Sequence, residues 1–262
     1  MTAENYGGQR DLMEDATMVG TLTHQANVVW PQEREILRRR LGDDLGRVLD
    51  LACGTGEGLR RIRRDFNTSA AVGLDLFAGH LRRAEPPVVV ADGYRAPFPD
   101  ATFDLVCVRH VLQALPDPVA LLREVRRLLK PGGRAHLLVE DYAGIFFDVE
   151  DYAIADHFRE VTQPFRAEGT DLYQGRRALR QLREAGFEDV AVDPFVVDNQ
   201  NSDPDELAGV FHFWREGYAA KLARLLGVEE AEIRRRFDAM IRNIRDVDRY
   251  AAWLLFAVSA TR

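Results

Sequence analysis

The sequence predicts an α/β fold with a doubly wound, largely parallel sheet. From residue 47 onward, short β-type runs alternate with helical stretches, and each parallel crossover needs a dozen or more residues. The first run ends in a glycine-rich turn that opens a helix. The third helical stretch carries apolar residues at helical spacing and ends in "KPGG", a stop signal. Together these observations indicate an α/β doubly wound pattern.

The elements of the first half follow from this alternation. Strands are expected at residues 47–51, 70–75, 87–91, 103–108 and 134–140. Helices are expected at residues 58–65, 77–84 and 118–130. After the fifth strand the regular alternation of strands and helices stops, which predicts a loop and a helix in place of another tight crossover.

The second half predicts further helices and two closing strands. A helix at residues 174–185 ends in "EAGFEDVAVDPFVV", where a glycine cap precedes a strand. Helices at residues 204–226 and 229–247 precede the tail "YAAWLLFAVSA", which is apolar enough for a final buried strand. Residues 1–46 are expected to be mostly helical, with a break near Pro31.

Composition and charge restrict the class of protein. The chain has 262 residues, 46% of them apolar and 29% charged, as in ordinary globular proteins. Its net charge of -7 argues against a general polyanion binder, so no nucleic acid partner is expected. Cys53 and Cys107 give neither a disulfide framework nor a metal site. With no apolar run near the roughly 20 residues of a membrane span and no signal peptide, we expect a cytoplasmic protein without a membrane partner.

The stretch "VLDLACGTGEG", residues 48–58, predicts a ligand site. A strand that ends in a glycine-rich turn and opens a helix brings backbone N–H groups and a partly positive helix end to one spot. Asp75 ends the second strand in "VGLDLF", where a carboxylate can accept both hydroxyls of a ribose. Asp92 ends the third strand, within reach of an adenine amino group, and "VRHVLQALPDP" follows the fourth. Polar residues of several strand ends thus share one rim.

The glycine spacing decides the class of ligand. Gly54, Gly56 and Gly58 give G-x-G-x-G, whereas a dinucleotide fingerprint is G-x-G-x-x-G, and no P-loop is present. Asp50, just before the turn, would repel a phosphate and favour an ammonium group. A ligand with ribose, adenine and an amino-acid ammonium but no phosphate is S-adenosylmethionine.

At these motifs the chain resembles the class I S-adenosylmethionine-dependent methyltransferases. The resemblance covers about residues 46–142 and includes "LLREVRRLLKPGGRAHLLVED". It implies a Rossmann-like seven-stranded sheet of order 3-2-1-4-5-7-6 with the last strand antiparallel. It also implies S-adenosylmethionine as cofactor and S-adenosylhomocysteine as product. The residues that it implies at the cofactor are Asp50, Ala52, Gly54 and Gly56 at the methionine part, Asp75 at the ribose, Leu76, Asp92 and Gly93 at the adenine, and Arg109 near the methionine end.

The residues for the acceptor are less strongly indicated. His110 follows the fourth strand and could reach a substrate hydroxyl as a general base, or be a polar rim residue. Asp141 and Tyr142 follow the fifth strand and face the same rim, so they are candidate substrate contacts. Alternatively, they only cap the loop and pack against it. Tyr6, in "ENYGG", could fold over the cofactor's carboxylate. His157 and His212 are interpreted as structural.

The long aromatic segments outside the core predict a small acceptor. We expect one domain, with an N-terminal helical lid (1–46), a cofactor-binding core (47–142), and substrate-lid helices with closing strands (143–262). An aromatic-lined, closed cavity suits a small, partly apolar molecule better than a polymer. The stripe of Phe211, Trp214 and Tyr218 equally fits a homodimer face or a cavity wall.

The sequence therefore predicts an enzyme that methylates O, N or C of a small molecule, in a role that suits specialised metabolism. A sterol or quinone C-methyltransferase would share the core. Two other classes stay open: a non-catalytic S-adenosylmethionine-binding regulatory or scaffold protein, whose motifs would be the same, and a nicotinamide-dependent enzyme, against which the glycine spacing counts.

Overall fold

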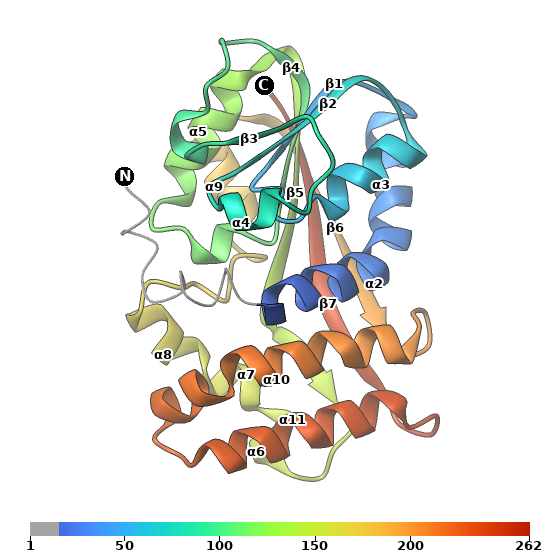
Figure 1. The fold of residues 1–262 in the computed structure, drawn as a ribbon, viewed down its shortest axis with the longest axis vertical. Coiled ribbons are helices and arrows are strands. Elements are labelled where there is room, and N and C mark those ends of the chain that lie inside the picture. Colours follow the sequence, from blue (N-terminus) through green and yellow to red (C-terminus); the bar gives the residue numbers. More distant parts are fainter. Residues whose placement is uncertain (1–15) are drawn as a thin grey trace.

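The computed structural model describes residues 16–262 and has the predicted sheet at its centre (Figure 1). Its strand order is β3-β2-β1-β4-β5-β7-β6, as expected. Pairs along the first five strands are parallel, and β7 runs antiparallel to both β5 and β6. The strands are β1 (Asp44–Leu51), β2 (Asn67–Asp75), β3 (Val88–Val90), β4 (Phe103–Arg109), β5 (Leu129–Phe147), β6 (Glu188–Asp198) and β7 (Ala251–Thr261).

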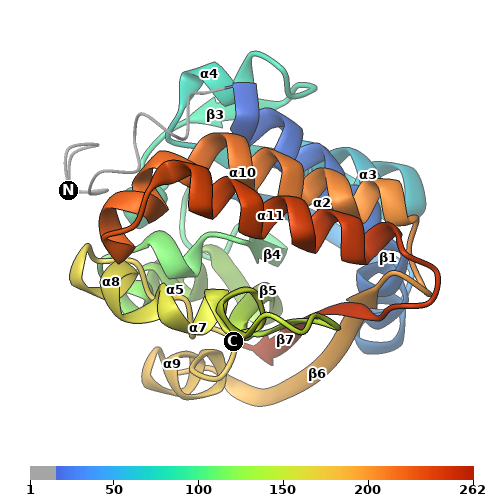
Figure 2. The same ribbon diagram turned by 90° about the horizontal axis from the view of Figure 1, so that it is seen from below.

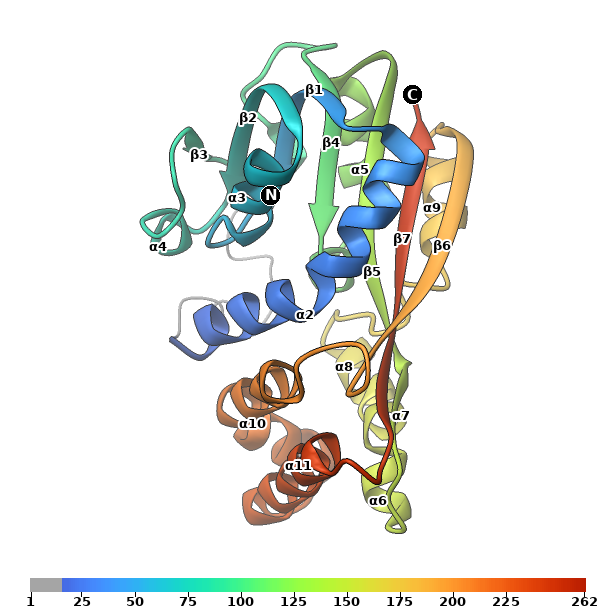
Figure 3. The same ribbon diagram turned by 90° about the vertical axis from the view of Figure 1, so that its right-hand side faces the viewer.

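Helices cover both faces of the sheet because successive strand residues point to opposite sides. Val48 of β1 packs with Trp30 of α2 and Leu59 of α3, whereas its neighbour Leu49 packs in the cluster that contains Leu122 of α5. One layer therefore holds α2 (Ala16–Leu41), α3 (Glu57–Asp65) and α4 (Ala78–Leu81), and the opposite layer holds α5 (Pro118–Leu128) and α9 (Ala178–Glu184). Figure 3 shows the two layers on either side of the sheet.

A second group of helices lies beyond the carboxyl ends of the parallel strands, where β5 and β7 project past the rest of the sheet (Figures 1 and 2). The long helices α10 and α11 pack on each other, and α10 also packs on α2. Their apolar faces form a separate core cluster with the end of β5. The helices of this group are α6 (Tyr152–Ala155), α7 (His157–Glu160), α8 (Thr162–Ala167), α10 (Pro204–Leu226) and α11 (Glu230–Arg245).

The structure corrects several element boundaries. Pro31 does not end the N-terminal helix but lies inside α2, which bends along its course (Figure 3), as expected where a backbone N–H is missing. The fifth strand continues to Phe147 instead of ending at residue 140, because its outer part pairs with Ala251, Ala252 and Trp253 of β7. The single helix expected after it is divided into three short ones. No helix within residues 16–262 is long and apolar enough to cross a membrane.

Candidate active site

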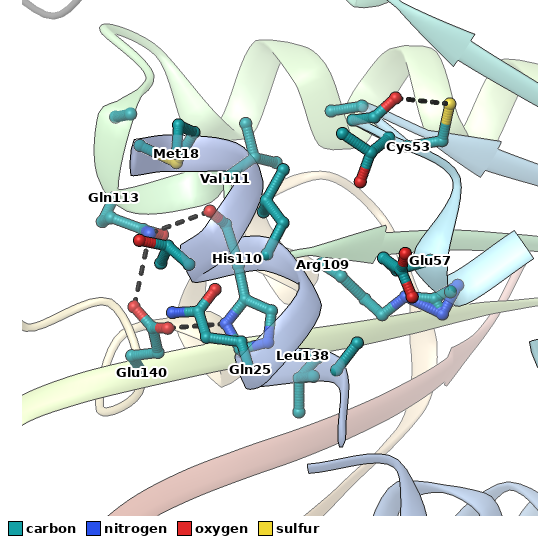
Figure 4. Close-up of a pocket in the computed structure, with 18 of the residues that line it drawn as sticks. Met18, Gln25, Cys53, Glu57, Arg109, His110, Val111, Gln113, Leu138 and Glu140 are labelled. Atoms are coloured by element: carbon teal, nitrogen blue, oxygen red, sulfur yellow. Dashed lines mark hydrogen bonds and ion pairs between the residues drawn. The ribbon is translucent and has the colours of Figure 1, made fainter. Parts of the chain in front are cut away.

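One cavity lies at the carboxyl ends of β1, β2, β4 and β5, beneath α2, and continues under α7, α8, α10 and α11. Figure 4 shows residues that line it near Arg109, His110 and Glu140. The glycine turn, Asp75 and Arg109 line its first part. Tyr142, Trp214 and other aromatic side chains line its second part. The cavity therefore brings together the motif residues of the sheet and the aromatic residues of the added helices.

The glycine turn holds its shape through left-handed backbone. Ala52, Gly54 and Gly56 have φ angles of 60°, 54° and 78°, of which the first is unusual for a residue with a side chain. A Cβ on Gly56 would come within 2.8 Å of the Ala84 Cβ. Gly56 precedes α3 and lies behind the cavity wall, whereas Ala52 and Gly54 line the cavity.

Asp75 fixes the turn from the end of β2. Its two carboxylate oxygens accept hydrogen bonds from the backbone N–H groups of Gly54 (2.8 Å) and Phe77 (2.9 Å). Burial raises the pKa of Asp75, and these two donors oppose the rise. Each oxygen keeps a further lone pair, so the side chain can still accept hydroxyl groups of a ligand.

A buried group of charges lies next to the turn. The Arg109 Nη2 atom is 3.2 Å from Asp50 Oδ2, and its Nη1 atom is 3.6 Å from Glu33 Oε1 of α2. His136 Nε2 approaches the same Glu33 oxygen at 3.1 Å. Gly58 makes room for this arrangement, since a Cβ there would lie 2.4 Å from the Arg109 guanidinium carbon. The arginine thus joins the strand-end acid to the N-terminal helix.

Burial and pairing act in opposite directions on these acids. For Glu33, burial raises the pKa, but Arg109 and His136 outweigh it, and the net pKa is lowered. For Asp50, burial raises the pKa and Arg109 compensates in part, while Glu33 and Asp75 raise it further. Excess negative charge therefore gathers here, which suits a cationic ligand group.

The Arg109 guanidinium also has donors to spare. Neither Nη atom makes an aligned hydrogen bond with a described residue, and both are buried. Arg109 was expected beside the cofactor's methionine end, but Glu33 was not identified. No local signal marks Glu33, because it lies in a helical stretch outside every motif.

His110 is held in a fixed orientation at the end of β4. Its backbone is left-handed (φ 51°), and its ring Nδ1 lies 2.6 Å from Glu140 Oε1 (Figure 4). Gln113 Nε2 donates to the His110 carbonyl (2.9 Å) and lies 3.3 Å from Glu140 Oε2. With the carboxylate accepting at Nδ1, Nε2 is the ring atom left to accept a proton. The arrangement can act as a general base.

Alternation along β5 separates the two predicted substrate contacts. Glu140 and Tyr142 line the cavity, whereas Asp141 points to the opposite face and forms an ion pair with Arg176. Asp141 is only 3% exposed and does not line the cavity. Glu140 was missed in the sequence, although the period of two would have found it: if Tyr142 faces the cavity, residue 140 does so too.

The adenine-side residues fall in different places. Leu76 and Gly93 line the cavity. Asp92 does not line it; its side chain caps the short 3-10 helix Gly93–Arg95 by accepting from the Tyr94 N–H (2.9 Å). Tyr6 lies outside the described residues.

The aromatic part of the cavity, here called the chamber, is closed by the added helices. Tyr142 stacks on Trp214 with ring centres 5.6 Å apart, and Phe158 meets Trp214 edge-on at 5.8 Å. Trp214 and Tyr218 of α10 line the cavity, so their stripe is a cavity wall in this structure. The chamber residues that line the cavity are Tyr142, Phe158, Val161, Phe165, Thr170, Leu172, Trp214, Tyr218, Leu222 and Phe237.

The cysteines show no sign of reactivity. Burial raises the pKa of both the Cys53 and the Cys107 thiols, which keeps them protonated. Among residues 16–262, no group of three or more His, Cys, Asp and Glu side chains is arranged to hold a metal ion.

Residues 49–137 match the family described as "Methyltransferase domain". The match begins within β1 and ends within β5, and it contains the glycine turn, Asp75 and His110. Residues 49–137 are therefore similar to a methyltransferase domain, which agrees with the resemblance to the class I S-adenosylmethionine-dependent methyltransferases. This family uses S-adenosylmethionine as its methyl donor.

The chain is similar to methyltransferases that act on varied molecules, as their names state. A demethylmenaquinone methyltransferase of Corynebacterium kroppenstedtii is 37% identical over 117 residues, 43% of this chain and 49% of that protein. A 27-O-demethylrifamycin SV methyltransferase of Amycolatopsis mediterranei is 34% identical over 169 residues, 58% of this chain and 57% of that protein. In both comparisons the chain spans about half the length of its relative.

A solved structure shares the fold over almost the whole chain. Haemonchus contortus phosphoethanolamine N-methyltransferase 2, in complex with S-adenosyl-L-methionine, aligns with a TM-score of 0.59 at 20% identity. The alignment covers 97% of this chain and 59% of that one. The added helices thus have counterparts in a larger methyltransferase.

Proposed function

We propose that this protein transfers a methyl group from S-adenosylmethionine to an oxygen, nitrogen or carbon atom of a small, partly apolar organic acceptor. The supporting observation is the single cavity that joins the motif residues of β1 and β2 to the aromatic chamber. His110 lines it, next to Arg109 in the chain and paired with Glu140, which faces the chamber with Tyr142. In this proposal the cofactor occupies the part at the strand ends, and the acceptor occupies the chamber.

The residues at the sheet edge fit the cofactor chemically. Asp50 and Glu33 offer buried carboxylates to an ammonium group, and the free donors of Arg109 suit a carboxylate. We assign Asp75, which lines the cavity, to the ribose hydroxyls. On the resemblance to the family we also assign Ala52, Gly54 and Gly56 to the methionine part and Leu76, Asp92 and Gly93 to the adenine.

The chain's contribution to the reaction is mainly to hold two molecules in line. When bound, the cofactor supplies a methyl group already activated by a sulfonium leaving group. Correct positioning of reactants is worth on the order of 7–11 kcal/mol. For an acceptor hydroxyl, His110 Nε2 would take the proton, and Glu140 keeps the imidazole ring oriented for this role. The base adds on the order of 10²–10⁴ in rate.

The proposal also covers the partners, the cellular location and the metabolic role of the protein. The net charge of -7 supports a partner that is not nucleic acid, and the two unpaired cysteines support a cytoplasmic location. Similarity to a methyltransferase named for a rifamycin supports a role in specialised metabolism. A homodimer, if formed, would use a face other than the Trp214 stripe.

Calorimetric titration with S-adenosylmethionine, S-adenosylhomocysteine and NAD tests the cofactor. We expect micromolar binding of the first two and none of NAD. A screen of small acceptors for the mass gain of one methyl then tests transfer. Preference for NAD would overturn the proposal, and tight cofactor binding without methylation of any acceptor would favour a non-catalytic binding protein.

A further inference from the structure

The charges around the chamber are distributed unevenly. Glu140 is 1% exposed and faces the cavity, paired with His110. Within residues 16–262, the arginines that line the cavity are Arg61 and Arg109. Arg61 belongs to α3 and pairs with Glu57, and Arg109 pairs with Asp50 and Glu33. Both therefore belong to the first part of the cavity, which we propose holds the cofactor and which is here called the cofactor part.

The cations behind the chamber wall are already neutralised. Lys221 lies over the Phe165 ring, with Nζ 5.0 Å from the ring centre and 2.9 Å from Glu168 Oε2. Arg236 Nη1 lies 2.8 Å from Glu160 Oε2. Neither side chain lines the cavity. An anionic group in the chamber would thus lose its hydration next to Glu140 without gaining a counter-ion from the described residues.

The chamber does offer uncharged hydrogen-bonding groups. Burial raises the pKa of Tyr218 to about 12, with Glu140 adding to the rise. Burial also raises the pKa of Tyr142 well above its usual value, again reinforced by Glu140. Both phenols therefore stay protonated at neutral pH; the Tyr142 O–H is directed at Glu140, and the Tyr218 O–H can donate to a neutral oxygen. Tyr142, Phe158 and Trp214 line the cavity, and their aromatic side chains favour an aromatic molecule.

We infer that the chamber selects an uncharged aromatic acceptor whose hydroxyl lies at His110 Nε2, and rejects acceptors that carry a phosphate or carboxylate. This inference rests on the proposed function and narrows it to a substrate class. It separates this chain from the phosphate-bearing acceptor named for the Haemonchus enzyme. Glu140 has two roles here: it positions His110 and repels anions.

Three probes that share the naphthalene ring and differ in charge test the inference: 1-naphthol, 1-naphthoate and 1-naphthylmethylammonium. Each is titrated into the full-length protein saturated with S-adenosylhomocysteine, and binding is followed by calorimetry. We expect 1-naphthol to bind at least tenfold tighter than 1-naphthoate. Equal or tighter binding of naphthoate would overturn the inference, as would tighter binding of the ammonium probe or no binding of 1-naphthol up to millimolar concentration.

A variant that removes the Glu140 charge tests whether this carboxylate causes the preference. Glu140→Gln should strengthen 1-naphthoate binding and reduce the naphthol preference several-fold, because the repelling carboxylate is gone. Glu184→Gln is the matched control, since Glu184 is an exposed carboxylate of α9 that pairs with Arg180 and does not line the cavity, so its removal should leave the preference unchanged. An unchanged preference in folded Glu140→Gln would contradict the assigned cause. Failure of S-adenosylhomocysteine to bind beforehand would instead count against the proposed function.

Discussion

The two parts of the cavity are formed by different structural elements and different types of residue. The cofactor part lies on strand ends, with a short turn held by Asp75 and a buried group of charges around Arg109. The chamber lies among helices, with aromatic rings packed on one another and Glu140 as its buried carboxylate. The first part is fixed by backbone hydrogen bonds and charge, and the second by side-chain packing.

This difference agrees with the extent of the family match. Strand ends of a parallel sheet hold their positions because neighbouring strands are hydrogen-bonded, so the same residue types can meet the same cofactor. Rings packed between helices can be exchanged with little effect on the sheet. The family match accordingly covers residues 49–137 and omits α10 and α11, which supply much of the chamber.

The largest predicted effect is on the reaction rate, when the proposed base His110 is removed. His110→Ala should slow methyl transfer on the order of 10²–10⁴-fold, because the base is lost, and leave cofactor affinity nearly unchanged. Single-turnover assays and calorimetry measure the two quantities. His212→Ala, which removes an exposed imidazole on α10, is the control. An unaffected rate in His110→Ala would exclude it as the base.

A second substitution tests the charges of the cofactor part. Arg109→Met leaves Glu33 and Asp50 buried without their partner, so the free energy of unfolding should fall by roughly 3–5 kcal/mol. Urea unfolding measures it. Arg39→Met removes an exposed arginine paired with Asp193 and should cost about 1 kcal/mol or less. Equal losses in both variants would show that the buried group is not a special source of stability.

A pH experiment tests the helical part. Burial, reinforced by Arg236, lowers the pKa of His157 to about 3. Because the unfolded chain binds this proton near its ordinary pKa of about 6.5, the stabilising effect of the neutral ring is complete above that pH and lost as the pH falls. From pH 7 to pH 5 the loss should be about 2 kcal/mol.

The matching variant is His157→Phe, which keeps an aromatic ring next to Phe158 and Phe237. It should make the free energy of unfolding less sensitive to pH between 7 and 5. The same pH dependence in both proteins would assign the acid sensitivity to other groups.

The smallest predicted change concerns the ribose contact. Asp75→Ala should weaken S-adenosylmethionine binding at least tenfold, about 1.4 kcal/mol, since a buried charged acceptor is lost. Calorimetry measures it, with Asp100→Ala, an exposed loop acid paired with Arg127, as control. Wild-type affinity in a folded Asp75→Ala protein would remove the ribose assignment.

Much of the cofactor part could be predicted because its signals are local. The turn needs glycine where φ is positive, and Asp75 is the last residue of its strand. The prediction was least accurate where orientation matters. Asp141 was chosen in place of Glu140, and a one-residue difference along a strand puts a side chain on the opposite face. The break predicted near Pro31 was wrong, because the packing of α2 outweighs the local cost of a proline inside the helix.

The sequence by itself determined the fold class, the strand order implied by its resemblance, and the acids at the strand ends. These depend on residues close in the chain and on the common edge of a parallel sheet. The tertiary structure alone decided that Glu33 meets Arg109, that Glu140 orients His110, and that Trp214 stacks on Tyr142. Each of these contacts joins separate elements, so it exists only after those elements pack together.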